Sequence, residues 1–298
     1  MNIFSFIYLV SIYFLFNIFS LFGDISIESQ LIFSSSLILI FGVPHGSLDN
    51  LLFLSKNKIS STIFYIIYLS IASLYFFAWI YWPIHSFIIF LIISAYHFGE
   101  SQFSDYKFEN KLKNFFFLIW GLFLMSSLLF LNSKELTYLT TYFPDTTEFA
   151  SIYNNLIIKN IFFICLTSSI LTMLFFVHKK YISFEDFFSE LFQIFLIYIT
   201  FKLFPIIIGF TLYFIFIHSF RSLYHEYLYL KKQDEKINFK KFIFLLIPHS
   251  VISYLFIFFI GYASYKDYIP ISLPLLMLIV ISVITLPHAL VMSNFYNK

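Results

Sequence analysis

The sequence has few charged residues, because aspartate, glutamate, lysine and arginine together make up only 11% of its 298 residues. In a soluble domain about a quarter of the residues are charged, so the composition excludes that class. The net charge of +2 and the lack of a basic patch exclude a nucleic-acid partner. The single cysteine, Cys165, excludes both an intramolecular disulfide and a metal site built from several thiolates.

Long apolar runs are what the sequence has instead, and hydrophobic residues make up 60% of the chain. Runs of about 20 residues, the length that crosses a hydrocarbon core of about 30 Å, recur from end to end. They predict an all-α fold, a polytopic transmembrane bundle of about ten spans that forms a single integral membrane domain. The predicted spans are 2–22, 31–54, 60–80, 84–99, 114–131, 157–177, 187–204, 206–230, 242–260 and 271–295.

Lysine placement predicts the orientation of these spans. If the N-terminus is cytoplasmic, only Lys134, Lys159, Lys202 and Lys266 fall on the non-cytoplasmic side, and all other lysines fall on the cytoplasmic side. This bias follows the positive-inside rule. It predicts an even number of spans, both termini in the cytoplasm and a location in the cell (inner) membrane. The first run lacks a basic start and a cleavage pattern, so we expect a retained helix.

Five histidines lie within segments that otherwise look like membrane spans: His45, His97, His218, His249 and His288. At 1.5 Å per residue, all five lie roughly 5–20 Å from the cytoplasmic ends of their predicted helices. An ionisable residue inside a span is by default a functional candidate, and a shared depth is what a common metal site requires. The alternative is that each imidazole simply forms a hydrogen bond across a helix interface.

Prolines next to three of these histidines favour a site over plain packing. Pro44, Pro248 and Pro287 each directly precede a histidine. Proline removes a backbone donor and kinks a helix, and irregular backbone at membrane depth is tolerated only beside protein or a cavity. Imidazole nitrogens without thiolates suit Zn, Cu or Fe. In a site reached from lipid, redox iron acting on an apolar molecule is the interpretation that we favour.

Carboxylates near the histidines are candidates for the second shell of such a site. Asp49 follows His45 by four residues, on the same helical face, and Glu100 closely follows His97. Glu226 adjoins His225. Carboxylates placed in this way can accept the second ring N–H and fix the tautomer that binds a metal. For Glu100 and Glu226, an ordinary interfacial charge is the alternative.

Four motifs follow one another along the chain: GVPHGSLD at residues 42–49, AYHFGE at 95–100, YFIFIHSFR at 213–221 and TLPHAL at 285–290. In this order they resemble the Brp/Blh family of membrane β-carotene 15,15′-dioxygenases. The resemblance extends from about residue 38 to the end of the chain. It implies cleavage of the central double bond of β-carotene by O2 to give two retinals, which would supply a rhodopsin-type protein. It also implies that the cofactor is Fe²⁺.

The resemblance implies that His45, His97 and His218 bind this iron. The family's fourth ligand is a histidine one helical turn after the third, and here that position is Ser222. Because serine is a poor ligand for ferrous iron, we assign Ser222 to the second shell. By depth, His288 and His249 are the candidates for the fourth ligand.

A proton- or ion-coupled transporter is the main alternative function. In that reading Asp49, Arg221 and the histidines form a relay. The acidic residues are few, and no inverted repeat is visible in the sequence. A di-iron hydroxylase would require HxxHH-like boxes, which the sequence lacks. A haem protein with histidine ligands would be recognised by its absorption spectrum.

Overall fold

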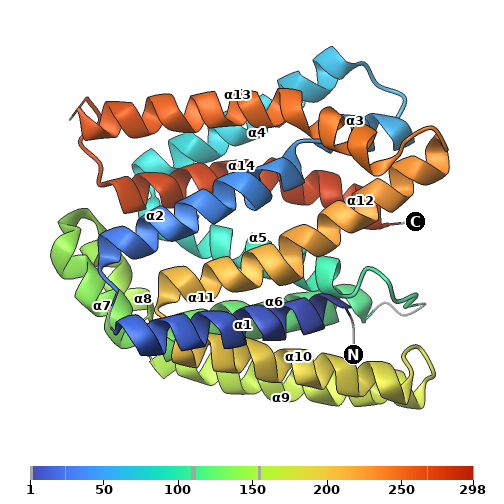
Figure 1. Ribbon diagram of the computed structural model, residues 1–298, viewed down its shortest axis with the longest axis horizontal. Coiled ribbons are helices and arrows are strands. Elements are labelled where there is room, and N and C mark those ends of the chain that lie inside the picture. Colours follow the sequence, from blue (N-terminus) through green and yellow to red (C-terminus); the bar gives the residue numbers. More distant parts are fainter. Residues whose placement is uncertain (1–2, 24, 109–111, 154–155, 267, 298) are drawn as a thin grey trace.

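The computed structural model describes residues 3–23, 25–108, 112–153, 156–266 and 268–297. Within these ranges all regular structure is helical, so the predicted all-α fold is confirmed. The long helices lie side by side in one bundle (Figure 1). Nine helices in the described ranges are long and apolar enough to cross a membrane, as a polytopic membrane protein requires.

Seven of these nine helices are uninterrupted: α1 (Ile3–Phe22), α4 (Ser61–Tyr81), α5 (Pro83–Gln102), α6 (Lys113–Leu131), α9 (Leu156–His178), α13 (Phe239–Tyr265) and α14 (Leu273–Tyr296). The other two contain irregular turns. One consists of α2 (Ile27–Leu37), the π-helix η1 (Ile38–Gly42), the 3₁₀ turn η2 (Val43–Gly46) and α3 (Asp49–Lys56). The other consists of α11 (Ile206–Tyr213), the π-helix η4 (Phe214–Ser219) and α12 (Phe220–Gln233).

The remaining long helix, α10 (Phe184–Leu203), matches the predicted span 187–204. It has 20 residues, the length of a span, but Glu185, Asp186 and Glu190 make it more polar than the nine. The start of α1 and the end of α14 lie at the same end of the bundle (Figure 1), as an even number of crossings requires. The number of spans and the side that faces the cytoplasm remain predictions.

Residues that cap helix N-termini lie at the start of several of these helices. Ser60 and Asn238 accept backbone N–H groups at the N-termini of α4 and α13. Ser183 and Asp186 form a reciprocal capping box at the start of α10, which satisfies two backbone donors that the helix itself cannot. Pro83 is the first residue of α5, where a proline costs no helical hydrogen bond. Between α6 and α9 the chain forms α7 (Ser133–Tyr142), η3 (Pro144–Phe149) and α8 (Ala150–Tyr153).

Helices α5 and α6 touch through their backbones. A Cβ atom added at Gly99 would collide with the carbonyl oxygen of Phe117, and one added at Gly121 would collide with that of Ala95. Small residues allow this close approach between membrane helices. The contact holds α5, which carries His97, firmly against the centre of the bundle.

Helix α13 lies at the edge of the bundle and packs more loosely. Its main contacts are with η2 and α14. Large apolar side chains such as Phe258 and Phe259 are 65% and 64% exposed, as expected for a helix that faces lipid. Pro248 lies within this helix, which remains α-helical on both sides of it.

A network of buried amides and a carboxylate joins α1, α5 and α10, and we call Ser5, Gln102, Tyr106, Glu190 and Gln193 the amide network. Gln102 Nε2 donates to Glu190 Oε2 at 2.7 Å, and Tyr106 donates to Glu190 Oε1 at 3.2 Å. Gln193 Nε2 donates to Gln102 Oε1 at 2.7 Å, and Ser5 donates to Gln193 Oε1 at 3.1 Å. Each carboxylate and amide oxygen in the network therefore accepts a hydrogen bond from within the protein.

Candidate metal centre

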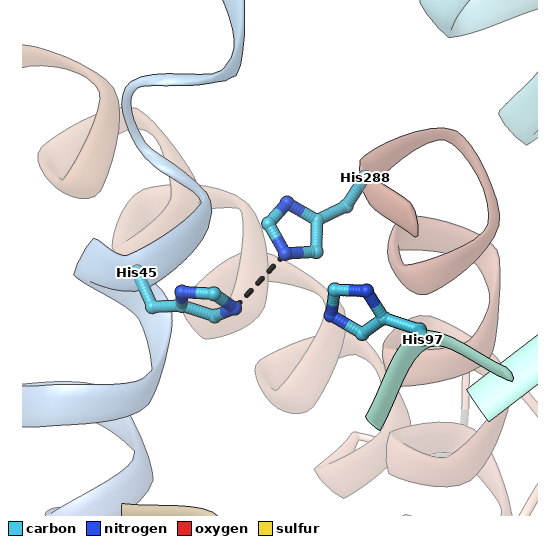
Figure 2. Close-up of side chains that lie close together, drawn as sticks. All are labelled: His45, His97 and His288. Atoms are coloured by element: carbon cyan, nitrogen blue, oxygen red, sulfur yellow. Dashed lines mark hydrogen bonds between the residues drawn. The ribbon is translucent and has the colours of Figure 1, made fainter. Parts of the chain in front are cut away.

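Three buried histidines from separate parts of the chain converge inside the bundle. His45 comes from η2, His97 from α5 and His288 from α14 (Figure 2). Their exposed fractions are 4%, 2% and 6%. Each offers a ring nitrogen within 4.8 Å of those of the other two, and the Nε2 atoms of His45 and His288 are 2.9 Å apart. The fold therefore brings together imidazoles that are up to 243 positions apart.

His218 lies against the same group. Its ring centroid is 4.8 Å from that of His45 and 4.9 Å from that of His97. The rings of Phe98 and Phe214 pack on it at 4.5 and 5.6 Å. We call His45, His97, His218 and His288 the histidine cluster.

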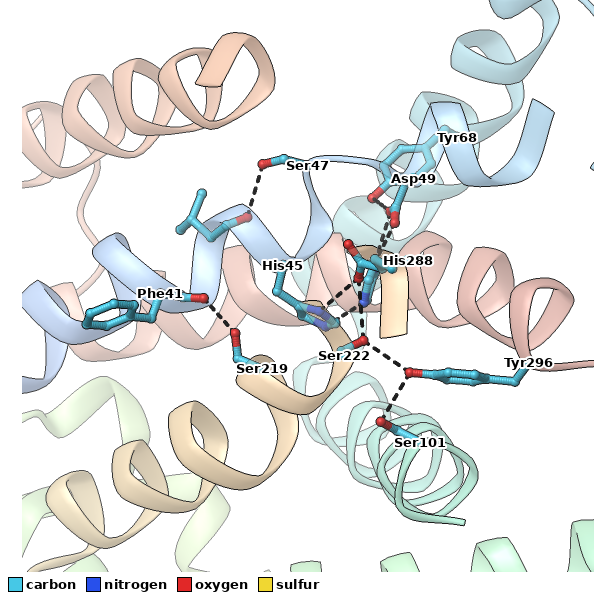
Figure 3. A network of polar contacts seen from close by, with 12 residues as sticks. Phe41, His45, Ser47, Asp49, Tyr68, Ser101, Ser219, Ser222, His288 and Tyr296 are labelled. Atoms are coloured by element: carbon cyan, nitrogen blue, oxygen red, sulfur yellow. Dashed lines mark hydrogen bonds and ion pairs between the residues drawn. The ribbon is translucent and has the colours of Figure 1, made fainter. Parts of the chain in front are cut away.

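Irregular backbone presents two of the four imidazoles. His218 lies in the π-helix η4, and His45 lies in η2, directly after the π-helix η1. The two irregular segments are joined by Ser219, whose hydroxyl donates to the carbonyl of Phe41 at 2.6 Å (Figure 3). A Cβ at Gly42 would lie 2.7 Å from a ring carbon of Phe214, so only glycine allows this approach. π-Helical turns occur frequently at functional sites.

A buried carboxylate orients His288. Nδ1 of His288 lies 2.9 and 3.0 Å from the two oxygens of Asp49, and the hydroxyl of Tyr68 donates to the same carboxylate at 3.0 Å (Figure 3). With its proton on Nδ1, neutral His288 has a free lone pair on Nε2, which points toward His45. This is the carboxylate–imidazole arrangement that supports metal-binding histidines.

A second carboxylate lies on the far side of His45. Glu226 is fully buried, and its Oε1 is 3.5 Å from Nδ1 of His45, an ion-pair distance at the outer limit of hydrogen bonding. Ser222 donates to the same oxygen at 3.5 Å. The hydroxyl of Ser222 also lies 3.1 Å from that of Tyr296, which in turn donates to Ser101 at 3.2 Å (Figure 3). Ser222 therefore contacts the carboxylate that faces His45.

Several buried polar atoms of this region lack a protein partner among the described residues. They are both ring nitrogens of His97, Nδ1 of His45 and Oε2 of Glu226. Leaving such groups unsatisfied costs about 1–3 kcal/mol each. Imidazoles bind zinc at about 2.1 Å, so two nitrogens on one ion lie about 3 to 4 Å apart. The clustered nitrogens of His45, His97 and His288 approach this spacing, and the residues present fit a divalent ion.

Arg221 forms its ion pair outside the histidine cluster. Its Nη2 is 2.8 Å from Oδ2 of Asp105, and Nε2 of His225 is 3.1 Å from Oδ1 of the same carboxylate. Burial alone would raise the pKa of Asp105, but the hydrogen bond from His225 and the charge of Arg221 outweigh it and hold the pKa well below its usual range.

Two of the predicted site residues lie apart from the histidine cluster. His249 lies in α13, and its Nε2 is 2.8 Å from the hydroxyl of Tyr65 on α4. Glu100 is buried, and its Oε1 accepts a hydrogen bond from Ser293 at 3.1 Å. Of the two candidates for the fourth ligand, the structure therefore brings His288, and not His249, to His45 and His97.

Some residues of this region are not predicted by the sequence. The roles of Tyr68 and Tyr296 had no signal, because aromatic residues are frequent throughout the chain. The sequence predicts Glu226 as a partner of His225, whereas the structure places its carboxyl group next to His45. Of the three prolines, only Pro44 lies in non-α backbone, while Pro287, like Pro248, lies within a continuous α-helix.

Comparisons with known proteins add one match. The model of the protein family described as beta-carotene 15,15′-dioxygenase matches residues 36–296, a region that includes the whole histidine cluster. Searches for similar curated proteins and for similar solved structures found no match.

Proposed function

The chain belongs to the β-carotene 15,15′-dioxygenase family, and on that premise we propose that it is an iron-dependent enzyme that cleaves the central double bond of β-carotene with O2 to give two retinals. Membership supports a dioxygenase of this type. It favours that activity over the transporter that the sequence left open. The iron, its ligands and the products are the proposed part.

The observation that supports iron is the match between unsatisfied imidazole nitrogens and buried carboxyl groups beside them. The Asp49 carboxylate is bonded to His288 and that of Glu226 faces His45. If both carboxylates hold the protons on Nδ1, the Nε2 lone pairs of His45 and His288 face each other at 2.9 Å. That arrangement is repulsive without a cation between them, and a divalent ion bound by both Nε2 atoms would relieve the repulsion.

In this proposal His45, His97 and His288 hold the iron, and His218 lies beside them as a further ligand or a close neighbour. When bound, ferrous iron supplies the redox chemistry that allows O2 to react with an alkene. Asp49 and Glu226 keep the imidazoles in the binding tautomer. The deep burial of all four rings excludes water from the reacting groups, and the fixed helices orient the substrate's central bond.

We also propose the cellular setting that this activity requires. Substrate and product are both lipid-soluble, so the enzyme works within the bilayer as a multi-pass protein of the cell (inner) membrane. Retinal would leave through the lipid to a rhodopsin-type protein. The nine apolar helices of the described ranges support the membrane setting.

The test is expression in cells that accumulate β-carotene. We expect loss of pigment and accumulation of retinal, measured by chromatography. His45→Ala, His97→Ala, His218→Ala and His288→Ala should each keep the pigment. His178→Ala is the matched control, because His178 is exposed at the end of α9. Unchanged pigment with well-expressed protein would refute the activity, and full activity in the cluster variants would refute the site.

A further inference from the structure

A pocket of about 150 Å³ opens between α4 and α13, next to the histidine cluster. Gly46 and Asp49 form part of its inner wall. Both touch His288, since Asp49 is bonded to its Nδ1 and a Cβ at Gly46 would lie 3.6 Å from that atom. The pocket therefore borders residues that adjoin His288, a member of the histidine cluster, from the side of α13.

The outer part of the pocket faces the surroundings of the bundle. His249, Ile252 and Ser253 line it from one face of α13, at the spacing i, i+3 and i+4. Ile252 is 65% exposed. The hydrogen bond of 2.8 Å between Tyr65 and His249 links the two walls.

Most side-chain polar atoms of the wall are paired within the protein, whereas Nδ1 of His249 is buried without a partner among the described residues. Ser47 lies 2.8 Å from Ser250, and Asn50 donates to Ser61 at 3.0 Å. Tyr68 donates to Asp49, and Ser253 donates to the carbonyl of His249, each at 3.0 Å. With these groups paired internally, the pocket offers mainly ring and aliphatic carbons to a ligand. A ligand without hydrogen-bonding groups fits such a wall.

Two other sides of the histidine cluster are tightly packed. The α5–α6 backbone contact at Gly99 and Gly121 leaves no room for a chain on the side of α6. Phe98 and Phe214 pack directly on the ring of His218. The pocket between α4 and α13 lies on a different side of the cluster, next to Asp49 and Gly46.

We propose that the pocket between α4 and α13 is the access and binding site through which a linear polyene hydrocarbon reaches the histidine cluster from the bilayer. The identity of the ligand rests on the proposed function. A segment of the polyene chain would lie against Tyr68 and Ile252, beside the hydrogen bond that joins Tyr65 to His249. Aromatic rings suit a conjugated chain because they offer broad apolar faces.

Binding can be measured without cleavage in metal-free full-length protein placed in lipid nanodiscs. β-Carotene is achiral, so circular dichroism in its visible absorption band appears only when a chiral site holds it. We expect this band in the wild type and at least a fivefold weaker band, or fivefold weaker binding, in Ser253→Trp, which fills the pocket. Val251→Trp is the control, because Val251 is 45% exposed on the opposite side of α13 and should leave the band unchanged.

A second variant guards against misfolding. Ile252→Trp narrows the outer part of the pocket and should also weaken the band, while thermal unfolding of both variants stays near that of the wild type. A wild-type band in folded Ser253→Trp and Ile252→Trp would overturn the proposal. So would a wild type without a band, as expected if only lipid acyl chains enter the pocket.

The iron-loaded enzyme separates this proposal from the proposed function. We expect Ser253→Trp to raise KM for β-carotene at least fivefold with little change in kcat. A pocket-dependent band in a protein that never forms retinal would leave the binding site standing and refute the reaction. Retinal formation with unchanged KM in both tryptophan variants would support the reaction and refute the binding site.

Discussion

The histidine cluster and the amide network are both buried polar groups within one helical bundle, yet they differ in how completely they are satisfied. In the amide network, both oxygens of Glu190 and the side-chain oxygens of Gln102 and Gln193 accept hydrogen bonds from within the protein. Beside the histidine cluster, both nitrogens of His97 and one oxygen of Glu226 have no partner among the described residues.

This difference separates a structural network from a site. A saturated network has nothing to gain from a ligand, and it fixes the positions of α1, α5 and α10 relative to one another. A cluster with unsatisfied nitrogens is stabilised by a cation that those nitrogens bind. Helix α5 takes part in both, with Gln102 in the first and His97 in the second, so one helix ties the site to the rest of the bundle.

The most direct test of this difference is to remove one unsatisfied imidazole. We expect His97→Ala to lose iron and retinal formation by more than the roughly 10–100-fold that the loss of an outer partner costs. The fold should remain, because these nitrogens bond to nothing in the protein. Iron content by elemental analysis and helicity by circular dichroism measure the two effects. A variant that keeps its iron would show that His97 is a packing residue.

Substitution of Asp49, whose carboxylate lies beside His288, should have the next largest effect on iron affinity. Asp49→Asn keeps an acceptor but removes the charge, and we expect iron affinity to fall about 10–100-fold. Competition with a chelator of known affinity measures this change. Asp145→Asn is the matched control, because Asp145 accepts a backbone N–H from Ser272 and lies outside the histidine cluster. Equal affinities in the two variants would remove Asp49 from the site.

A substitution in the amide network should lower stability and leave iron affinity unchanged. Glu190→Ala leaves the amide of Gln102 and the hydroxyl of Tyr106 without their acceptor, which should lower the free energy of unfolding by about 1–3 kcal/mol. Iron affinity of the folded fraction should not change. Thermal unfolding together with iron content tests both halves. Loss of iron at unchanged stability would make the amide network part of the site.

The smallest effect is expected at Ser222, where the sequence resemblance implies a histidine. Its hydroxyl lies 3.5 Å from Oε1 of Glu226, at the outer limit of hydrogen bonding, and 3.1 Å from the hydroxyl of Tyr296. The neutral hydrogen bond to Tyr296 contributes about 0.5–1.5 kcal/mol. Ser222→Ala should therefore change kcat/KM by less than roughly tenfold. A loss as large as that of His97→Ala would mean that the hydroxyl contacts the iron directly.

Much of the fold could be predicted from the sequence, because each long apolar run is a local signal. The runs at 60–80 and 114–131 correspond to α4 and α6 within two residues. α10 was also anticipated as a helix, although its acidic first half makes it more polar than the rest. The predicted fourth span, 84–99, was too short, because α5 continues through the buried polar residues Glu100 to Gln102.

The site was predictable only in part, because it depends on contacts between distant segments. Depth along each helix brought His45, His97, His218 and His288 to one level, and the structure places all four together. The depth of a residue along its helix does not predict which neighbouring helix its side chain faces. It therefore does not distinguish His288 from His249, which contacts Tyr65 at the edge of the bundle. The π-helix at residues 214–219 also had no signal, since that segment contains neither glycine nor proline.

The backbone contact between α5 and α6 has a mechanical consequence. Two helices joined at Gly99 and Gly121 have no flexible side chains between them to absorb a change in angle, so we expect them to tilt as one body. A thinner or thicker bilayer changes helix tilt. Such a change would then carry His97 along with both helices, and the sensitivity of catalysis to lipid chain length would report on that shared movement.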